Sequence, residues 1–407
     1  MYETLAILAA FVFLYSIASA GLERTPINGA VVFTAFGLAF GPLGLNLLIL
    51  DLGEEGLRSL AEITLALVLF TDAANADLNT LRKSFHIPQR LLLIGLPLTI
   101  LIGYGIGVLV FSELTMLEIA ILATILAPTD AALGKAVVTD QSVPPDVREG
   151  LNVESGLNDG ICVPILFIFL ALATDASAQG NATQLALTLV AQAIGIGVAV
   201  GVGLTALGSW LLNKCSDRGW VTKTWRQLPV VAMAVACFAV AQSLGGSGFI
   251  AAFAGGLLFG GIDKDRKQTL LLAAEGTGDT LALITWVVFG SAVLAKSIGH
   301  FSWDVVIYAV LSLTIIRMVP VFLVLTGMKL RVDEKLFMSW FGPRGLASIV
   351  FAVIVLNHQL PGGGTIAMTA VCTILLSIVA HGISANPLVA ALAARIKRSD
   401  GKTVVGS

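Results

Sequence analysis

The chain has 407 residues, of which 57% are hydrophobic and only 12% are charged. Soluble domains carry about 25% charged residues, so this composition excludes an ordinary soluble domain and indicates an integral membrane protein. The formal net charge of −2 gives no reason to expect nucleic acid or a strongly acidic protein as a partner. The four cysteines are not spaced like zinc ligands or a disulfide framework.

Apolar segments of membrane-spanning length recur along the whole chain. A span needs about 20 mostly apolar residues, and on that template the sequence predicts about thirteen spans, at residues 4–21, 28–48, 58–75, 88–111, 115–138, 146–174, 184–213, 227–245, 247–262, 270–296, 303–328, 334–357 and 364–392. We therefore expect an all-α membrane protein that forms a single transmembrane unit over 1–407, with a short cytoplasmic tail at 395–407.

Lysine and arginine are distributed unevenly between the two sides of these spans. With the N-terminus outside, 20 of the 24 basic residues fall on the inner side, and only Arg58 and Lys296 fall on the outer side. The remaining two, Arg317 and Arg344, lie within spans. The positive-inside rule then predicts an outer N-terminus and a cytoplasmic C-terminus.

Two of the prolines within predicted spans stand close to a charged residue, and we expect each of these two to break its helix. Pro128 interrupts the fifth span and Pro343 interrupts the twelfth, because proline has no backbone N–H to donate. The spans can be divided into two six-helix repeats, spans 1–6 and 8–13, related by inversion, and the breaks then fall at matching places. Interrupted helices at corresponding positions of two inverted repeats indicate the midplane site of a transporter. Ordinary proline kinks are the alternative.

Polar side chains are concentrated beside the first of these breaks. Asp130, Glu154 and Asp159 lie within predicted spans, where an ionisable residue costs roughly 2.5–3.5 kcal/mol on insertion scales and usually marks an ion or substrate path. In a helix, Ser155 and Asp159 stack one turn apart, as do Glu154 and Asn158. Four polar side chains would therefore occupy one sector of a buried helix.

This polar sector suits a dehydrated cation. Carboxylate, hydroxyl and freed carbonyl oxygens are ligands that a hard cation such as Na+ prefers. Gly156 and Gly160 lie in the same helix, and we expect them to admit another segment closely, such as the unwound part of the fifth span. The alternative is a hydrogen-bonded polar seam between helices, which would not need two carboxylates.

These motifs together resemble a known family. Pro128-Thr-Asp130 followed by Glu154-Ser-Gly-Leu-Asn-Asp159 is similar to the discontinuous helix and Asn-Asp motif of NhaP-type sodium/proton antiporters, in the monovalent cation:proton antiporter-1 family. The similarity extends over nearly the whole chain and includes Gly342-Pro-Arg-Gly345 and Arg317. It implies thirteen helices per protomer and electroneutral exchange of Na+ for H+.

The resemblance also implies a division into two moving parts. A core, ion-translocation bundle would comprise approximately 88–174 and 303–392. It would move against a dimerisation domain of approximately 4–75 and 184–296. The expected assembly is a homodimer.

Carried over by residue, the resemblance assigns roles around the first break. Asp159 would be the principal carboxylate for cation and proton, Ser155 a ligand, and Thr129 the source of a backbone oxygen. Asp130 would assist through water or hydrogen bonds. Asn158 stands where electrogenic relatives carry a second aspartate.

Other charged residues within the predicted spans are interpreted as follows. Asp72 stands where the family often has glutamate, and would face the Na+ site from the other domain. Glu154 and Arg317 would form a structural ion pair. Arg344 would offset the carbonyl ends at the helix crossing or extend to the inner interface. Apart from the resemblance, the sequence leaves two interpretations of His381 in the last span, a pH sensor or a packing residue.

The leading hypothesis is therefore a secondary antiporter, not an enzyme, that exchanges Na+ or Li+ for H+ by alternating access and needs no cofactor. A K+/H+ antiporter of the same fold is the alternative, and a cation channel is a more remote one. An intramembrane aspartyl protease is disfavoured because the chain lacks a Gly-x-Gly-Asp motif. The expected partners are monovalent cations, protons and the lipid bilayer, in the cytoplasmic membrane of a prokaryote. The sequence leaves the roles of Glu275 and Asp279 open.

Overall fold

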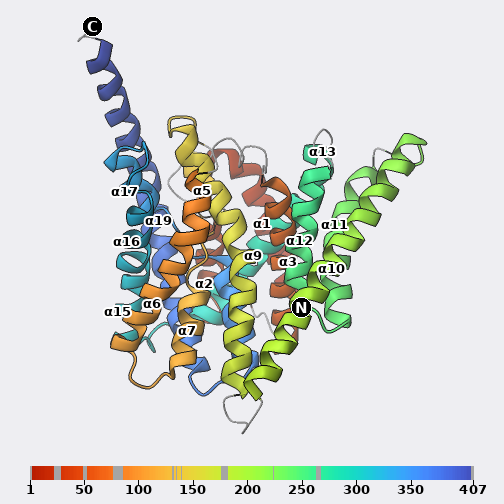
Figure 1. The fold of residues 1–407 in the computed structure, drawn as a ribbon, viewed down its shortest axis with the longest axis horizontal. Coiled ribbons are helices and arrows are strands. Elements are labelled where there is room, and N and C mark those ends of the chain that lie inside the picture. Colours follow the sequence, from red (N-terminus) through yellow and green to blue (C-terminus); the bar gives the residue numbers. More distant parts are fainter. Residues whose placement is uncertain are drawn as a thin grey trace.

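The computed structural model describes residues 2–22, 29–48, 53–76, 86–130, 133, 135–138, 140–175, 182–222, 224–262 and 267–404. All regular secondary structure in these ranges is helical, which agrees with the expected all-α class. Eight of the described helices are long and apolar enough to cross a membrane. The helices form a bundle, and the C-terminal end of the last one projects beyond it (Figure 1).

One set of helices combines the N-terminal and middle parts of the chain. It comprises α1 (Tyr2–Leu22), α2 (Gly29–Phe40), α3 (Gly53–Asn75), α10 (Ala182–Asp217), η2 (Trp225–Gln227), α11 (Leu228–Ser243), α12 (Gly248–Ile262), α13 (Lys267–Val288), η3 (Phe289–Leu294) and α14 (Ala295–Ser297). Within this set α12 packs against α3, α10 and α11, and α13 packs against α2 and α3. We call it the α3–α12 set.

The other set carries both predicted breaks. It comprises α5 (His86–Arg90), η1 (Leu91–Gly95), α6 (Leu96–Val110), α7 (Met116–Ile125), α8 (Lys135–Val138), α9 (Pro145–Asp175), α15 (Trp303–Leu313), α16 (Ile315–Val324), α17 (Val332–Trp340), α18 (Leu346–Asn357) and α19 (Gly363–Val404). Here α7 packs against α6 and α9, and α19 packs against α15 and α18. We call it the α9–α19 set. It meets the α3–α12 set where α9 and α18 contact α3 and where α9 contacts α10 and α12.

Several segments differ from continuous spans. The segment 28–48 is helical only as far as Phe40, because Gly41 and Pro42 follow. The segment 303–328 is divided at Thr314, whose backbone (φ −110°, ψ −94°) is not helical, a break that the sequence analysis did not predict. At the other end, residues 395–404 continue the helix α19, where a short tail was expected.

Glycines allow α3 and α12 to pack with their backbones in contact. A Cβ atom at Gly256 would collide with the carbonyl of Phe70, and one at Gly260 would collide with the carbonyl of Ala74. Small residues at such an interface let membrane helices approach closely, and van der Waals contact then supplies much of the association energy. The α3–α12 contact therefore tolerates no side chain at these two positions.

This contact generates a stability prediction. Gly256→Ala should lower the melting temperature in detergent, because forced overpacking costs about 1–3 kcal/mol. Gly261→Ala is the matched control on the same helix, since the described structure places nothing within 4 Å of a Cβ there. Alanine at that position should be neutral or stabilising by up to about 1 kcal/mol. Equal melting temperatures for the two variants would contradict the contact.

Candidate functional site

The two interrupted helices meet and hydrogen-bond to each other. After α7 ends at Ile125, residues 126–130 continue without helical structure, and residues 341–345 do the same between α17 and α18. The N–H of Asp130 donates to the carbonyl of Pro343 at 2.8 Å. The hydroxyl of Ser348 donates to the carbonyl of Ile125, also at 2.8 Å. Each break thus satisfies backbone groups that the other exposes, as membrane interiors require.

Asp130 occupies the N-terminal end of α18. Its Oδ2 accepts a hydrogen bond from the N–H of Leu346 at 2.8 Å, and its Oδ1 accepts one from the N–H of Leu133 at 3.2 Å. A carboxylate is stabilised at a helix N-terminus by the free N–H groups and the helix dipole. Gly345 leaves the space that this requires, because a Cβ there would collide with the Asp130 carboxylate.

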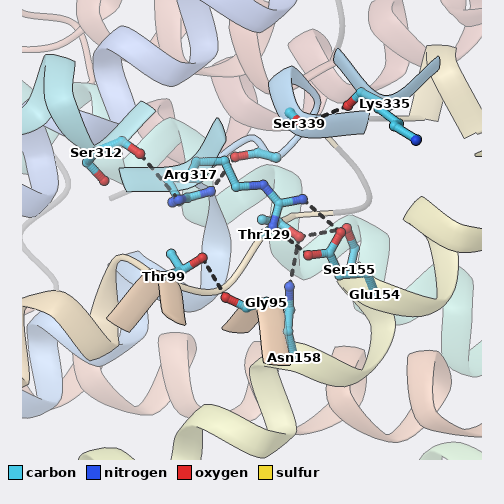
Figure 2. Close-up of polar contacts among 12 residues, drawn as sticks. Gly95, Thr99, Thr129, Glu154, Ser155, Asn158, Ser312, Arg317, Lys335 and Ser339 are labelled. Carbon is cyan, nitrogen blue, oxygen red and sulfur yellow. Dashed lines mark hydrogen bonds and ion pairs between the residues drawn. The ribbon is translucent and has the colours of Figure 1, made fainter. Parts of the chain in front are cut away.

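A network of side chains joins the unwound segment to α9. The hydroxyls of Thr129 and Ser155 lie 2.9 Å apart, and the Asn158 amide donates to the Thr129 hydroxyl at 2.8 Å (Figure 2). All three residues are buried. The sector of polar side chains that the helical spacing predicted therefore lies on α9 and faces the break after α7.

Asp159 is also buried, with 7% of its surface exposed. Its Oδ1 has no hydrogen-bond partner among the residues that the structure describes, and the Oδ1 of Asn158 is in the same state. Asp159 lies near enough to Asp130 and Asp72 to interact electrostatically with both. A buried carboxylate without a partner is costly unless it holds a proton or a cation, so Asp159 is suited to bind either one.

Asp72 approaches this region from α3. A Cβ atom at Gly156 would lie 3.6 Å from the Cβ of Asp72, so α3 and α9 are in contact there. At Gly160 a Cβ would instead collide with the ring of Phe253 in α12. The expectation that these glycines admit the unwound part of the fifth span was therefore wrong. They face the α3–α12 set, because the unwound segment contacts the neighbouring face of α9 through Ser155 and Asn158.

Two further acidic residues lie on the side of Asp72. Glu275 and Asp279 in α13 both interact electrostatically with Asp72. The Asn75 amide, at the end of α3, donates to Glu275 at 2.6 Å. Glu275 is therefore held between α13 and α3.

Glu154 and Arg317 form a buried ion pair. The guanidinium of Arg317 donates to both carboxylate oxygens, at 2.5 and 2.7 Å, and the side chains are 3% exposed or less (Figure 2). The break at Thr314 precedes the short helix that carries Arg317. A Cβ at Gly342 would collide with this guanidinium, so glycine is needed where Arg317 passes the second break.

Arg344 is fully buried, which excludes the alternative that it extends to the inner interface. Its guanidinium donates to the carbonyl of Gly342 and, at 3.5 Å, to the carbonyl of Ser312. Both carbonyls lie beside breaks, Ser312 two residues before Thr314 and Gly342 within 341–345. Arg344 therefore places a positive charge against carbonyl groups that interrupted helices leave free.

The sequence analysis missed residues that hold the second break from α19. Ser377 accepts a hydrogen bond from the N–H of Arg344 at 2.7 Å, and Ser384 accepts one from the indole of Trp340 at 2.9 Å. Their signal was present, because both share a helix face with His381 at spacings of four and three residues.

The groups at the site that could coordinate a cation are mainly oxygens, from carboxylate, hydroxyl and carbonyl groups. In the described part of the chain, no three His, Cys, Asp or Glu side chains are grouped as a metal ion would need. A cation held at Asp159 would therefore need hydroxyl and carbonyl oxygens as well, which suits a weakly held monovalent ion.

Comparison with known proteins identifies the family. The family model described as the transmembrane region of sodium/hydrogen exchangers matches residues 7–391. The chain belongs to the sodium/hydrogen exchanger family. Proteins of this family are transporters that exchange cations for protons, which confirms the resemblance found in the sequence and makes the chain an integral membrane protein.

Individual relatives of the chain are distant in sequence. It is 23% identical over 380 residues to the K(+)/H(+) antiporter NhaP2 of Shewanella sp. strain ANA-3, a match that covers 93% of this chain and 64% of the relative. It is 23% identical over 419 residues to a probable Na(+)/H(+) antiporter of Schizosaccharomyces pombe, covering 93% of this chain and 55% of that one. The chain thus spans less than two thirds of the length of these relatives.

The fold of the exchanger is similar to a solved structure. The sodium proton antiporter MjNhaP1 from Methanocaldococcus jannaschii at pH 8 superposes with a TM-score of 0.77 and 21% identity. The match covers 94% of this chain and 99% of that one. At this identity the likeness shows a shared fold.

The Glu154–Arg317 pair generates a prediction that separates structure from transport. Arg317→Ala should cost about 3–5 kcal/mol of stability, because it leaves the Glu154 charge buried and unpaired. The double variant Glu154→Gln with Arg317→Ala should lose much less than the sum of the single losses. Thermal unfolding of all four proteins in one detergent measures this, and additive losses would show that the pair contributes no coupling energy.

Proposed function

We propose that this exchanger is a secondary active antiporter that exchanges Na+ or Li+ for H+ without moving net charge. The observation that carries the proposal is Asp159, a buried carboxylate whose Oδ1 has no partner among the described residues. Cation and proton compete for this one group, since each neutralises it and neither leaves room for the other. The site then switches readily from one side of the membrane to the other only when this carboxylate is neutralised, because a charged carboxylate without an ion is costly to bury.

The neighbouring oxygens would complete the cation site. Asp159 supplies the charge, Ser155 a hydroxyl, Thr129 a backbone oxygen, and Asp72 a second carboxylate from α3. Asn158 holds Thr129 through its amide and adds no second charge, which favours one proton per monovalent cation. Asp130 supports the site by holding the crossing. The cation is the transported substrate. The proposed exchange needs no cofactor, and the protein would not be an enzyme.

Alternating access would arise from movement between the two helix sets. We propose thirteen membrane crossings that form two inverted six-helix repeats, with Pro128 and Pro343 at matching breaks. The core bundle, approximately 88–174 and 303–392, would move against the domain of approximately 4–75 and 184–296. The denser packing within each set than between them supports this division.

The surroundings of the protein follow from its charge distribution. We propose a homodimer in the cytoplasmic membrane of a prokaryote, with the N-terminus outside and the C-terminus inside. The excess of lysine and arginine in alternate loops supports this orientation. The chain would thereby contribute to cellular pH and sodium homeostasis.

K+/H+ exchange is the competing function within the same fold. The Shewanella relatives carry the name of K(+)/H(+) antiporters, whereas MjNhaP1 is named a sodium proton antiporter. A channel is more remote, because paired interrupted helices in one chain favour alternating access. Proteoliposomes given Na+, Li+ or K+ in turn distinguish these functions by the change in luminal pH.

Asp159→Asn should abolish exchange, with flux at least about a hundredfold below wild type, because an amide can neither release a proton nor offset a cation charge. The variant should fold and insert normally, since Asp159 Oδ1 makes no described hydrogen bond that the amide would break. Luminal pH in proteoliposomes gives the flux, and the melting temperature confirms folding. Appreciable cation-driven proton flux by the folded variant would exclude Asp159 as the carrier.

Competition at one carboxylate predicts a pH-dependent affinity. The apparent KM for Na+ should rise as pH falls, approaching about tenfold per pH unit where the protonated form dominates. An imposed membrane potential should not drive exchange by itself. Flux measured over a pH series, with and without a valinomycin clamp, tests both statements. A KM independent of pH, or exchange driven by potential alone, would contradict the single-site electroneutral mechanism.

A further inference from the structure

We propose that Ser377 and His381 of α19 are positioning residues that hold the second break in the geometry the cation site requires. This inference rests on the proposed function of the site at Asp159. Neither residue reaches the proposed cation ligands. Their effect passes through the backbone of residues 340–346 and through Asp130.

The ring of His381 connects α19 to the second break. Its Nε2 lies 3.0 Å from the carbonyl of Trp340, which only accepts, so Nε2 must donate. Its Nδ1 lies 3.2 Å from the hydroxyl of Ser377 and 3.0 Å from the carbonyl of the same residue, one turn earlier in α19.

Ser377 contacts both the second break and His381. Its hydroxyl oxygen accepts from the N–H of Arg344 at 2.7 Å and lies 3.2 Å from Nδ1 of His381. The connected chain runs from the Arg344 N–H through Ser377 to His381 and ends at the Trp340 carbonyl. It therefore binds α19 to the unwound segment at both of its ends, on either side of Gly342 and Pro343.

The surroundings keep this chain rigid. Ser377 is fully buried and His381 is 2% exposed. The ring of His381 packs on Trp340 with centroids 5.1 Å apart, and Ser384, on the same face of α19, accepts from the Trp340 indole. Buried hydrogen-bond networks of this kind restrict their members to one arrangement when every member is satisfied.

The segment held in this way contacts Asp130 directly. The Pro343 carbonyl accepts from the Asp130 N–H, and the Leu346 N–H donates to the Asp130 carboxylate. Thr129, the adjacent residue, is a proposed cation ligand. If α19 no longer holds residues 340–346, the two breaks are no longer fixed relative to each other. The oxygen atoms around Asp159 then occupy a wider range of positions.

The sequence alternatives for His381 were a pH sensor and a packing residue. The hydrogen bond from its Nε2 to the Trp340 carbonyl adds a third role, which is to position the second break. In this role His381 affects cation affinity through the geometry of residues 340–346. The side chain is required for its donor at Nε2.

The test compares Ser377→Ala with Thr373→Val. Thr373 is the matched control, because it lies one turn away on α19, is equally buried, and bonds only to the carbonyl of Thr369 in its own helix. Ser377→Ala should raise the apparent KM for Na+ about tenfold, the factor to which 1.4 kcal/mol corresponds, with maximal flux within about twofold. Thr373→Val should leave KM unchanged, and Ser377→Thr, which restores a hydroxyl, should recover most of the affinity.

A second readout does not depend on transport. Hydrogen–deuterium exchange should be faster in peptides that cover Arg344 in Ser377→Ala than in Thr373→Val, because only the first variant removes the acceptor of the Arg344 N–H. His381→Gln retains a donor for the Trp340 carbonyl and should stay near wild type, whereas His381→Leu should resemble Ser377→Ala. The pH profile of His381→Gln should match that of wild type.

The outcomes separate this inference from the proposed function. Wild-type protein that shows no cation/proton exchange would refute the function, while the deuterium measurement would still decide the positioning role. Equal deuterium uptake in Ser377→Ala and Thr373→Val would overturn the inference, as would equal KM values. A flattened pH profile in His381→Gln would overturn it in favour of a pH sensor.

Discussion

Hydrogen bonds between two unwound segments are the constraint on which the site depends. A break inside a membrane exposes N–H and C=O groups that no water satisfies, so the protein must supply partners. Here the Asp130 N–H of the first break donates to the Pro343 carbonyl of the second, and the Ser348 hydroxyl in α18 donates to the carbonyl of Ile125 at the end of α7. The same contact places the Asp130 carboxylate at the start of α18. The position of Thr129 beside Ser155 and Asn158 is a consequence of this crossing.

Two carboxylates on one helix differ in whether they can bind a further ion, because their partners differ. Glu154 and Asp159 are both buried in α9, five residues apart. Glu154 gives both oxygens to Arg317, whereas Asp159 Oδ1 meets no donor in the described structure. A bidentate pair with arginine leaves a carboxylate little capacity for another ion. The break at Thr314 starts the helix that carries Arg317, so a backbone irregularity in α15 and α16 helps to leave Asp159 as the available group.

Much of this arrangement could be predicted from local sequence patterns. Helical spacing placed Ser155 and Asn158 in one sector, and proline chemistry located both breaks, since each effect acts within a few residues. The direction of Gly156 and Gly160 could not be obtained this way, because spacing gives a helix face but not the neighbour that covers it. The same reason explains why Ser377 was missed, as its partner Arg344 lies 33 residues away on another helix. The break at Thr314 has no proline or glycine within three residues, so the local sequence gave no signal for it.

The full burial of Arg344 has a consequence for the energy of moving the helix set that contains it. At the level of the two breaks, this set carries Asp130 and Glu154 with negative charge and Arg317 and Arg344 with positive charge. Glu154 and Arg317 cancel as a pair, and the side chains of Arg344 and Asp130 are opposite in charge. Each uncompensated charge carried across the bilayer exchanges about 2.3 kcal/mol of electrical work per 100 mV. When Asp159 is neutral, these four fixed charges sum to zero. Moving them together across the membrane would then require no electrical work.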